Sequence, residues 1–389
     1  MEYVIVFLLF AYPLILRYKK HTHTSFYWMQ CGVIILLMGL RYYVGGDTMG
    51  YMTKYKYVSP ITEMAYKDFV LAEYQPLWVV LQCSCKYLSD EFYVLQLFIS
   101  TFVNISIFWV MRKYAENEFL AAFIYLVSCM LDYNCEILRA AIAISLFFIA
   151  YEELLAKHYV KYYLWVTVAV LFHDQAFLLL VIPFLMPFLK KSIPPSYIFG
   201  MLLIGVVLSL PSVISVYAPY LPGKRGMKFA QGYGAMMIGS LLGFVRTLIK
   251  VLLLYILAKT SIVKDDKRIL PVFNLYMCCS LLGVGMPIFQ TRVSQFFQIY
   301  YLIVLASFIY IYRRGLLKTA VIGMWMFGVI RNYTRDVTSW VDRNPNASNK
   351  YYFYEIYIPY YNIWETPDKT VLARRKAIAD QEILNASKR

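Results

Sequence analysis

Long apolar runs separated by short polar segments dominate the chain. Many of the runs approach the length of roughly 20 residues that an α-helix needs to cross the hydrocarbon core of a bilayer. The pattern predicts an all-α fold, a polytopic transmembrane helical bundle. About twelve spans are predicted, at residues 2–16, 24–40, 91–111, 118–134, 137–155, 159–173, 174–190, 195–217, 236–258, 269–287, 294–312 and 316–333. The apolar stretch 75–88 is short and interrupted, which is typical of an interfacial or re-entrant helix.

Composition supports a membrane protein. Of the 389 residues, 60% are hydrophobic and only 16% are charged, and the mean hydropathy is +0.55. A soluble domain is usually about a quarter charged. The aromatic fraction of 18% suits interfacial belts and an aromatic-lined cavity equally.

The distribution of Lys and Arg orients the predicted spans. The net charge is +15, and the basic residues are densest in the short loops of one side, which the positive-inside rule places in the cytoplasm. The N-terminus is then outside, and the first run is an uncleaved span because it lacks a basic leader and a cleavage site. The chain has no basic run with interleaved aromatic residues, so the sequence does not predict nucleic-acid binding.

The same count defines the domain organisation. Residues 1–333 are predicted to form the transmembrane bundle, with two long outer segments at about 41–90 and 218–235. Residues 334–389 form a polar and interfacial C-terminal tail, whose side of the membrane the count leaves open. The second outer segment is rich in Pro and Gly and is long enough to act as a lid.

No cofactor or metal site is predicted. The seven cysteines lie mostly in apolar runs and are odd in number, as expected of small core residues. The chain has no Walker loop, no HExxH and no nucleotide-binding glycine fingerprint. Paired acidic residues, the usual ligands of a divalent metal, fall on the predicted inner loops.

One polar stretch, 39–57, has the means to hold an anion. It reads GLRYYVGGDTMGYMTKYKY and follows the second span. Arg41 offers a planar fork of donors for a phosphate, the glycine pair Gly45–Gly46 permits a tight turn, and Asp47 adds a carboxylate. Tyr51 belongs to a set of tyrosines typical of a membrane interface. The alternative is a solvated loop with a snorkelling arginine and an aromatic belt.

Three further ionisable residues are predicted at the same membrane face. Arg139 opens the fifth span, His173 closes the sixth beside Asp174, and Arg292 lies between the tenth and eleventh. Ionisable groups at such positions tend to face a cavity or one another, so together with Arg41 they predict an anion site with a proton carrier. Each also has an ordinary explanation. Arg139 would snorkel at a helix end, His173 would form a structural hydrogen bond, and Arg292 would be a loop charge.

Two cations lie inside a predicted span. Arg246 and Lys250 are four residues apart within 236–258 and share one helical face. They would repel each other unless an anion or a carboxylate neutralises their charge. They line the same cavity or mark an inner helix end.

Four ordered motifs resemble the EpsG branch of Wzy-type polysaccharide polymerases. They are GLRYYVGGDTMGY, LRAAIAISLFF, FHDQAF and RVSQFF. The family pattern is matched at Arg41, Tyr42, Val44, Gly45, Asp47, Tyr51, Arg139, Ala143, Ser145 and His173. The chain departs from it at Ala140, where the family usually has Gln, and at Gln175, where it often has Ser or Thr.

This resemblance implies an enzyme of the bacterial inner membrane whose active site faces the periplasm or exterior, in a bundle like the GT-C-like architecture of Wzy polymerases and ligases. It joins glycan repeat units carried on undecaprenyl pyrophosphate, without metal. The pyrophosphate would be held by Arg41, Arg139 and Arg292, with Tyr51 and Arg246 as further substrate contacts. His173 or Asp47 would be the base, His173 being preferred. Membrane lipids, a chain-length regulator and a flippase are the expected partners.

Other classes stay open. A flippase or transporter of lipid-linked oligosaccharide would also place cations in a cavity, and Arg246 with Lys250 favours it. An O-antigen ligase shares the chemistry but uses another acceptor. A membrane O-acyltransferase would also use a histidine within the membrane.

Overall fold

The computed structural model describes residues 1–72, 74–208, 213, 216, 241–283, 292–313, 315–338, 340–342 and 350–388. These residues are mostly helical, in agreement with the predicted all-α class. They divide into two compact units. The first comprises Met1–Lys113, Asn117–Pro183 and Tyr333–Gln381, and the second comprises Tyr114–Glu116, Phe184–Asn332 and Glu382–Arg389. The predicted outer segment 218–235 lies outside the described residues.

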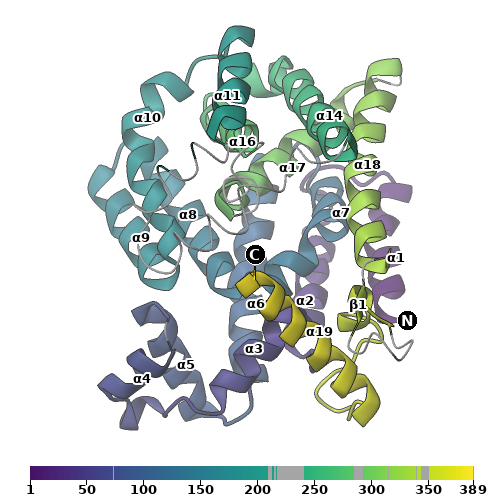
Figure 1. The fold of residues 1–389 in the computed structure, drawn as a ribbon. Coiled ribbons are helices and arrows are strands. Elements are labelled where there is room, and N and C mark those ends of the chain that lie inside the picture. Colours follow the sequence, from purple (N-terminus) through teal and green to yellow (C-terminus); the bar gives the residue numbers. More distant parts are fainter. Residues whose placement is uncertain are drawn as a thin grey trace. The chain divides into compact units, whose positions relative to one another are not determined.

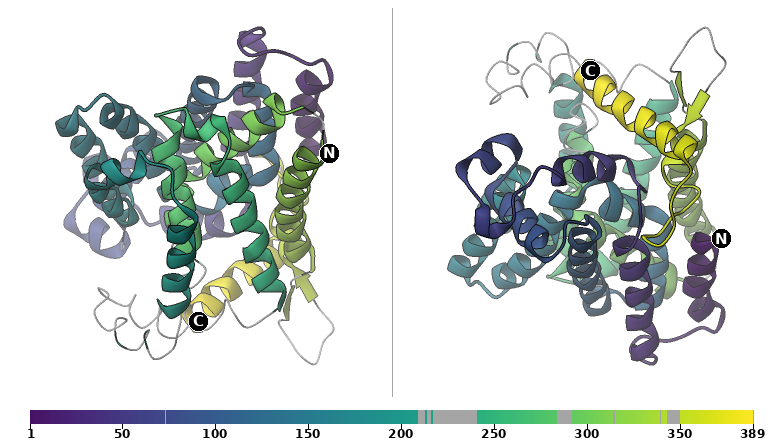
Figure 2. Two further views of the ribbon diagram at one scale, coloured as in Figure 1. Left: turned by 90° about the horizontal axis from the view of Figure 1, so that it is seen from above. Right: turned by 90° about the horizontal axis from the view of Figure 1, so that it is seen from below.

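The first unit is built from the N-terminal helices and the tail (Figures 1 and 2). Its elements are α1 (Glu2–Ile15), α2 (Thr24–Gly39), α3 (Gly46–Tyr55), η1 (Ile61–Glu63), α4 (Tyr66–Ala72), α5 (Pro76–Leu88), α6 (Tyr93–Tyr114), α7 (Glu118–Ser128), the π-helical turn η2 (Asp132–Glu136), α8 (Leu138–Leu155), α9 (Tyr159–Phe172), η3 (Asp174–Val181), β1 (Trp340–Asp342), β2 (Lys350–Tyr352), η7 (Phe353–Ile356) and α19 (Lys369–Lys388). The two strands pair antiparallel, with Val341 opposite Tyr351.

The second unit holds the remaining helices. They are α10 (Ile182–Leu189), α11 (Pro195–Leu208), α14 (Leu241–Ala258), α15 (Ser261–Lys264), α16 (Ile269–Leu282), α17 (Gln295–Ile311) and most of α18 (Leu316–Thr338). Packing of α16 against α11, α14 and α17 forms its core. Apolar side chains cover α16 and α17 on all sides, as expected of a helix buried in a larger assembly.

One helix in the described part of the chain has both the length and the apolar character to cross a membrane. This is α6, with 22 residues and a mean hydropathy of 1.9. Other apolar helices are shorter, at 10–17 residues, and include α1, α2, α7, α9, α11, α16 and α17. Several predicted spans are thus shorter or broken, because η2 interrupts 118–134 and η3 begins 174–190. Twelve crossings stay a prediction.

Hydrogen bonds define two ends of the first unit. At one end the turn between α1 and α2 meets the start of α7, where Asn117 Nδ2 donates to the carbonyl of Tyr18 at 2.9 Å. Glu118 is fully buried there and accepts from the backbone N–H of His21 at 3.1 Å. The other end, here called the motif end, holds the loop after α2, the start of α8 and the tail. There the hydroxyl of Tyr3 donates to the carbonyl of Tyr357 in the tail at 3.4 Å.

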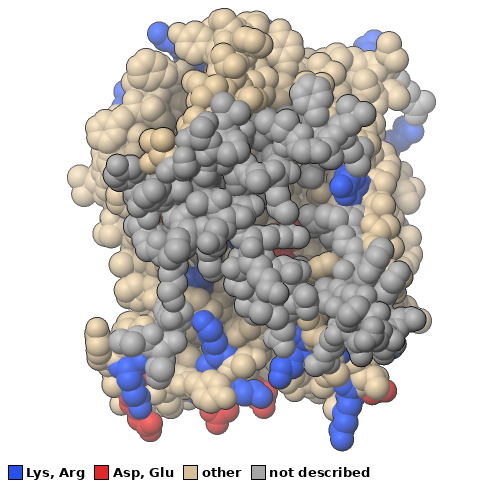
Figure 3. Space-filling view, viewed as in Figure 1, with Lys and Arg blue, Asp and Glu red and all other residues tan. Residues whose placement is uncertain are grey.

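Successive segments of the chain reach these two ends in turn, as helices that cross a membrane one after another would. The tail lies at the motif end, whereas the charge count had left its side of the membrane open. Figure 3 shows Lys and Arg beside Asp and Glu along the edge where α4 and α5 lie. Which end faces the cell exterior stays a prediction.

A buried polar network ties α6 and α7 to η2 in the first unit. Asn104 donates to Asn134 Oδ1 at 2.7 Å, and Tyr125 donates to Asn104 Oδ1 at 3.0 Å. Asn134 also donates to the carbonyl of Met130 at 2.9 Å, and all three side chains are at most 2% exposed. Because buried polar groups are costly without partners, this network fixes η2 in place, and η2 leads directly into the motif end.

Candidate functional site

The loop after α2 is shaped by two residues in the left-handed region of backbone conformation. Tyr43 has φ 54° and Gly45 has φ 101°. At Gly45 an added Cβ would lie 2.7 Å from Cβ of Cys135 and 3.0 Å from Oγ1 of Thr48, so only glycine fits both the conformation and the space. Gly45 thereby turns the chain directly into α3. The turn predicted at the glycine pair is confirmed, and the close approach at Gly45 is to Cys135 and Thr48.

The N-terminus of α3 is occupied by a carboxylate of the protein. Glu136 accepts from the backbone N–H of Gly46 at 2.9 Å and from that of Asp47 at 3.1 Å, one bond on each oxygen. Tyr357 donates its hydroxyl to the same carboxylate at 2.6 Å. A negative charge is stabilised at this end of a helix. Sequence analysis missed Glu136, although an acid three residues before Arg139 in an apolar region was a usable signal.

Arg41 is buried and directed into the protein. The residue is only 1% exposed to solvent. Its guanidinium donates to the carbonyls of Met38 and Val44, the latter at 3.2 Å, and to Thr48 Oγ1 at 3.0 Å. These contacts give Arg41 the role of holding the loop against α3. A direct contact with substrate stays a prediction.

Arg139 differs because its partners are neutral and it is partly exposed. Its Nε donates to the hydroxyl of Tyr51 at 3.1 Å and its Nη1 to Gln75 Oε1 at 2.7 Å. The guanidinium carbon lies 4.2 Å from the centroid of the Tyr74 ring. Burial raises the pKa of Tyr51 to about 12, against the opposing effect of Arg139. Tyr51 is therefore neutral, and its own hydroxyl hydrogen is available to an acceptor other than Arg139.

A second cation reaches the same aromatic ring. Nζ of Lys54 lies 4.3 Å from the centroid of Tyr74. On α3 Asp47, Tyr51 and Lys54 follow one another at spacings of four and three, so they share one face of the helix. Asp47 and Lys54 are exposed, whereas Tyr51 is 7% exposed. Lys54 was not predicted as a site residue, because nothing in its local sequence separates it from Lys56.

His173 lies at the same end of its helix pair as Arg139. α8 and α9 pack closely along their length and are joined by a short turn (Figure 1), so the start of α8 and the end of α9 coincide. Nδ1 of His173 accepts from the backbone N–H of Gln175 at 3.3 Å, whereas Asp174 Oδ1 is 3.7 Å away, beyond hydrogen-bond reach. If the imidazole is neutral and accepts this bond, its proton is on Nε2.

The remaining predicted residues belong to the second unit. Arg292 is exposed and precedes α17. The side chain of Arg246 lies outside the described residues. Nζ of Lys250 lies 5.3 Å from the centroid of the Tyr276 ring, so this cation contacts an aromatic face. The structure thus brings Arg41, Asp47, Tyr51 and Arg139 together around α3, with His173 at the same end of the first unit.

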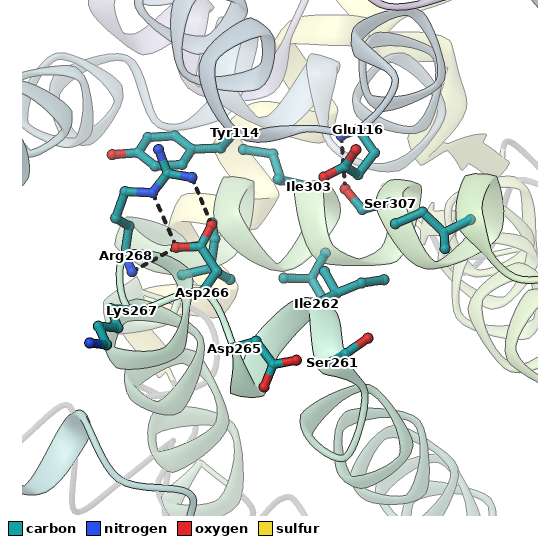
Figure 4. A pocket seen from close by; sticks show the side chains of 13 residues that line it. Tyr114, Glu116, Ser261, Ile262, Asp265, Asp266, Lys267, Arg268, Ile303 and Ser307 are labelled. Carbon is teal, nitrogen blue, oxygen red and sulfur yellow. Dashed lines mark hydrogen bonds and ion pairs between the residues drawn. The ribbon is translucent and has the colours of Figure 1, made fainter.

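A cavity of about 660 Å³ lies elsewhere, within the second unit (Figure 4). Arg268 forms two hydrogen bonds with the carboxylate of Asp266, at 3.1 and 2.9 Å, and covers the ring of Tyr114. Burial alone would raise the pKa of Asp266, but the bonds from Arg268 outweigh it and lower that pKa. Arg268 and Asp266 pair their charges here, and no predicted site residue lines this cavity.

Metal ligands do not cluster in the part of the chain that the structure describes. No three His, Cys, Asp or Glu side chains converge there. Independence from metal stays a prediction.

Comparison with known proteins gives one result. No curated protein and no solved structure matches the chain. The model of the EpsG family matches residues 24–344, which include α3, Arg139, His173 and Arg292. Over most of its length, therefore, the chain is a member of the EpsG family.

Proposed function

We propose that this protein is a polymerase that joins glycan repeat units carried on undecaprenyl pyrophosphate. Membership of the EpsG family makes it a membrane protein of polysaccharide biosynthesis. The finer assignment is to the outer face of the bacterial inner membrane, with the motif end facing the periplasm or exterior. It rests on the resemblance of the four motifs and on the chemistry of the residues around α3.

The observation that carries the proposal is the convergence of two cations on Tyr74. Arg139 and Lys54 lie 4.2 and 4.3 Å from the centre of one ring, and the described hydrogen bonds of Arg139 go to neutral groups. In contrast, Arg268 is paired with Asp266 and Arg112 lies 3.7 Å from Glu118. Positive charge that is not neutralised by these partners favours an anionic ligand with several oxygens, such as a pyrophosphate.

The proposed reaction uses this charge on the leaving group. A hydroxyl oxygen of one glycan forms a bond to the anomeric carbon of the other. The bond from that carbon to the pyrophosphate oxygen breaks, and its electron pair leaves with the pyrophosphate. Arg139, Lys54 and the hydroxyl of Tyr51 stabilise the charge that develops there. Arg292 and Arg246 stay proposed substrate contacts on the resemblance of the motifs, and no metal is assigned.

The proton of the attacking hydroxyl needs an acceptor. Asp47 is exposed on the face of α3 that carries Tyr51 and Lys54. Nδ1 of His173 accepts from the backbone N–H of Gln175, so in its neutral form this side chain can donate but cannot accept through Nε2. We therefore assign the base to Asp47 and hydrogen-bond donation to His173, which reverses the preference drawn from the sequence.

Lys54→Met tests the proposal, with Lys56→Met as the matched control. Both residues are exposed lysines of one segment, but only Lys54 is placed on Tyr74 in the described contacts. In cells, Lys54→Met and Arg139→Gln should lose long polymer while single repeat units still reach the surface. Removing a hydrogen bond or contact to a charged group costs about 1.5–3 kcal/mol, roughly a tenfold to hundredfold loss of rate.

Other outcomes identify other functions. If single repeats also disappear from the surface, the protein is a flippase or transporter. If polymer forms normally but is not attached to its final acceptor, it is a ligase. If both variants make polymer of ordinary length at ordinary protein abundance, the cations on Tyr74 are not the site.

A further inference from the structure

The segment that follows the family-matched region is tied to the motif loop. The family match ends at residue 344, yet residues 355–375 form hydrogen bonds to residues 37–45. The bonds join Tyr42 N–H to the Tyr361 carbonyl at 2.8 Å, Gly45 N–H to the Ile356 carbonyl at 3.2 Å, Ile363 N–H to the Leu40 carbonyl at 3.0 Å, and the Tyr360 hydroxyl to the Leu37 carbonyl at 2.7 Å. Thus the tail is bonded both to the end of α2 and to the loop that follows it.

Arg375 is the centre of this attachment. It is fully buried, and it donates to three backbone carbonyls: Nε to Glu355 at 2.8 Å, Nη1 to Tyr43 at 2.9 Å, and Nη2 to Pro359. Its guanidinium carbon also lies 5.3 Å from the centre of the Tyr361 ring. A planar fork that joins three separate backbone points is specific to arginine.

The bond from Arg375 acts on a strained residue. Tyr43 is a non-glycine residue with φ 54°, a conformation that is unfavourable for a residue with a Cβ and persists only where surrounding contacts fix it. Its carbonyl is the one that accepts from Arg375. The tail therefore supplies a contact that maintains the turn leading into α3.

The tail also reaches the start of α3 through a second contact. Tyr357 donates to Glu136 at 2.6 Å, and Glu136 holds the first two N–H groups of α3. Since α3 carries Asp47, Tyr51 and Lys54, a shift of its first turn would move all three relative to Arg139. A displacement of about 1 Å in such a site can cost a hundredfold in rate.

We propose that the C-terminal segment 355–375 is an integral part of the active site, with Arg375 and Tyr357 as positioning residues. They touch neither the substrate nor the reacting atoms, and they act through Tyr43 and Glu136. This inference rests on the proposed function for its rate effect but not for its structural effect. It also extends the functional chain beyond the residues that define the family.

The test uses the full-length protein in detergent and in cells. Tyr357→Phe removes one hydroxyl and keeps the ring, and Arg375→Lys keeps the charge and loses the fork. The matched controls are Tyr354→Phe, one residue before the segment, and Arg374→Lys, whose arginine is half exposed and pairs with Glu355 at 3.5 Å. Each variant is measured for amide hydrogen exchange at residues 41–50, for binding of undecaprenyl pyrophosphate, and for polymer length at matched abundance in the membrane.

We expect Tyr357→Phe and Arg375→Lys to exchange faster at 41–50 and to shorten the polymer by about tenfold or more. Binding of undecaprenyl pyrophosphate should change less than threefold (about 0.6 kcal/mol), and both controls should resemble the unmodified protein. Unchanged exchange, or faster exchange with polymer of ordinary length, overturns the proposal. If exchange responds as expected but Arg139→Gln polymerises normally, the proposed function fails while the attachment of the tail stands.

Discussion

The guanidinium of Arg139 donates to the hydroxyl of Tyr51 across a sequence separation of 88 residues, at 3.1 Å. Tyr51 lies one turn after Thr48 on α3, and Thr48 accepts from Arg41 and donates to the carbonyl of Cys135. One helix of ten residues thus connects two of the three arginines that the sequence motifs contain. Arg41 holds the loop from within, whereas Arg139 is partly exposed and donates to neutral groups.

This coupling predicts non-additive effects of substitution at Arg139 and Tyr51. Tyr51→Phe should lower polymerisation because Arg139 loses one of its two orienting bonds and the substrate loses a donor. Arg139→Gln should lower it further, and Tyr51→Phe should then add little. The coupling free energy is expected to be about 0.5–3 kcal/mol. Polymer length distributions of the two single variants and the double variant measure it, and fully additive losses would show that the bond does not position Arg139.

The sequence singled out several residues that the structure brings together around α3. Arg41, Asp47 and Arg139 are ionisable residues in an apolar chain, and Tyr51 was found through the motif resemblance. Their roles toward a substrate stay predictions, and Arg41 bonds within the protein. Gly45 was identified as a turn because glycine tolerates positive φ. The long apolar runs likewise predicted the all-α fold.

The partners of these residues were not predictable from local pattern. Glu136, Gln75 and Tyr357 acquire their roles only when distant segments meet, and Lys54 differs from Lys56 in lying on α3, which ends at Tyr55. The span predicted at 118–134 is broken because η2 interrupts its α-helical bonding, and a π turn leaves the hydropathy of the run unchanged. The span predicted at 174–190 keeps almost its predicted length, because η3 and α10 run on from Asp174 to Leu189.

Gly45→Ala should destabilise the protein and abolish polymerisation. The added Cβ would meet Cys135 at 2.7 Å and would have to occupy φ 101°, a strain of about 1–3 kcal/mol before the clash. Gly50→Ala is the matched control, because an added Cβ there meets nothing within 4 Å and alanine favours a helix interior by about 1 kcal/mol. Thermal unfolding in detergent should therefore move in opposite directions for the two variants; a shift of the same sign in both would contradict the loop geometry.

Two buried glutamines should respond oppositely to replacement by methionine. Gln82 is fully buried in α5, and neither end of its amide has a hydrogen-bond partner in the described structure. Gln96 is 2% exposed in α6 and donates to the carbonyl of Arg41 at 2.8 Å. Since an unsatisfied buried amide costs about 1–3 kcal/mol, Gln82→Met should raise the free energy of unfolding, whereas Gln96→Met should lower it. Denaturation followed by tryptophan fluorescence measures both, and a loss of stability in Gln82→Met would mean that its amide has a partner.

His173 and Asp47 can be separated by substitutions that preserve shape. Glutamine at 173 can place an amide N–H near the position of imidazole Nε2 but cannot take a proton, so His173→Gln should retain polymerisation if His173 donates a hydrogen bond. His173→Leu fills the space without a donor and should lose it. Asp47→Asn keeps the shape of the side chain, removes the carboxylate and should be inactive, because the attacking hydroxyl then has no base on α3. Polymer length at matched protein abundance distinguishes these roles. An inactive His173→Gln beside an active Asp47→Asn would return the base to His173. Activity in both would mean that departure of the pyrophosphate dominates the barrier and that the reaction needs no side-chain base.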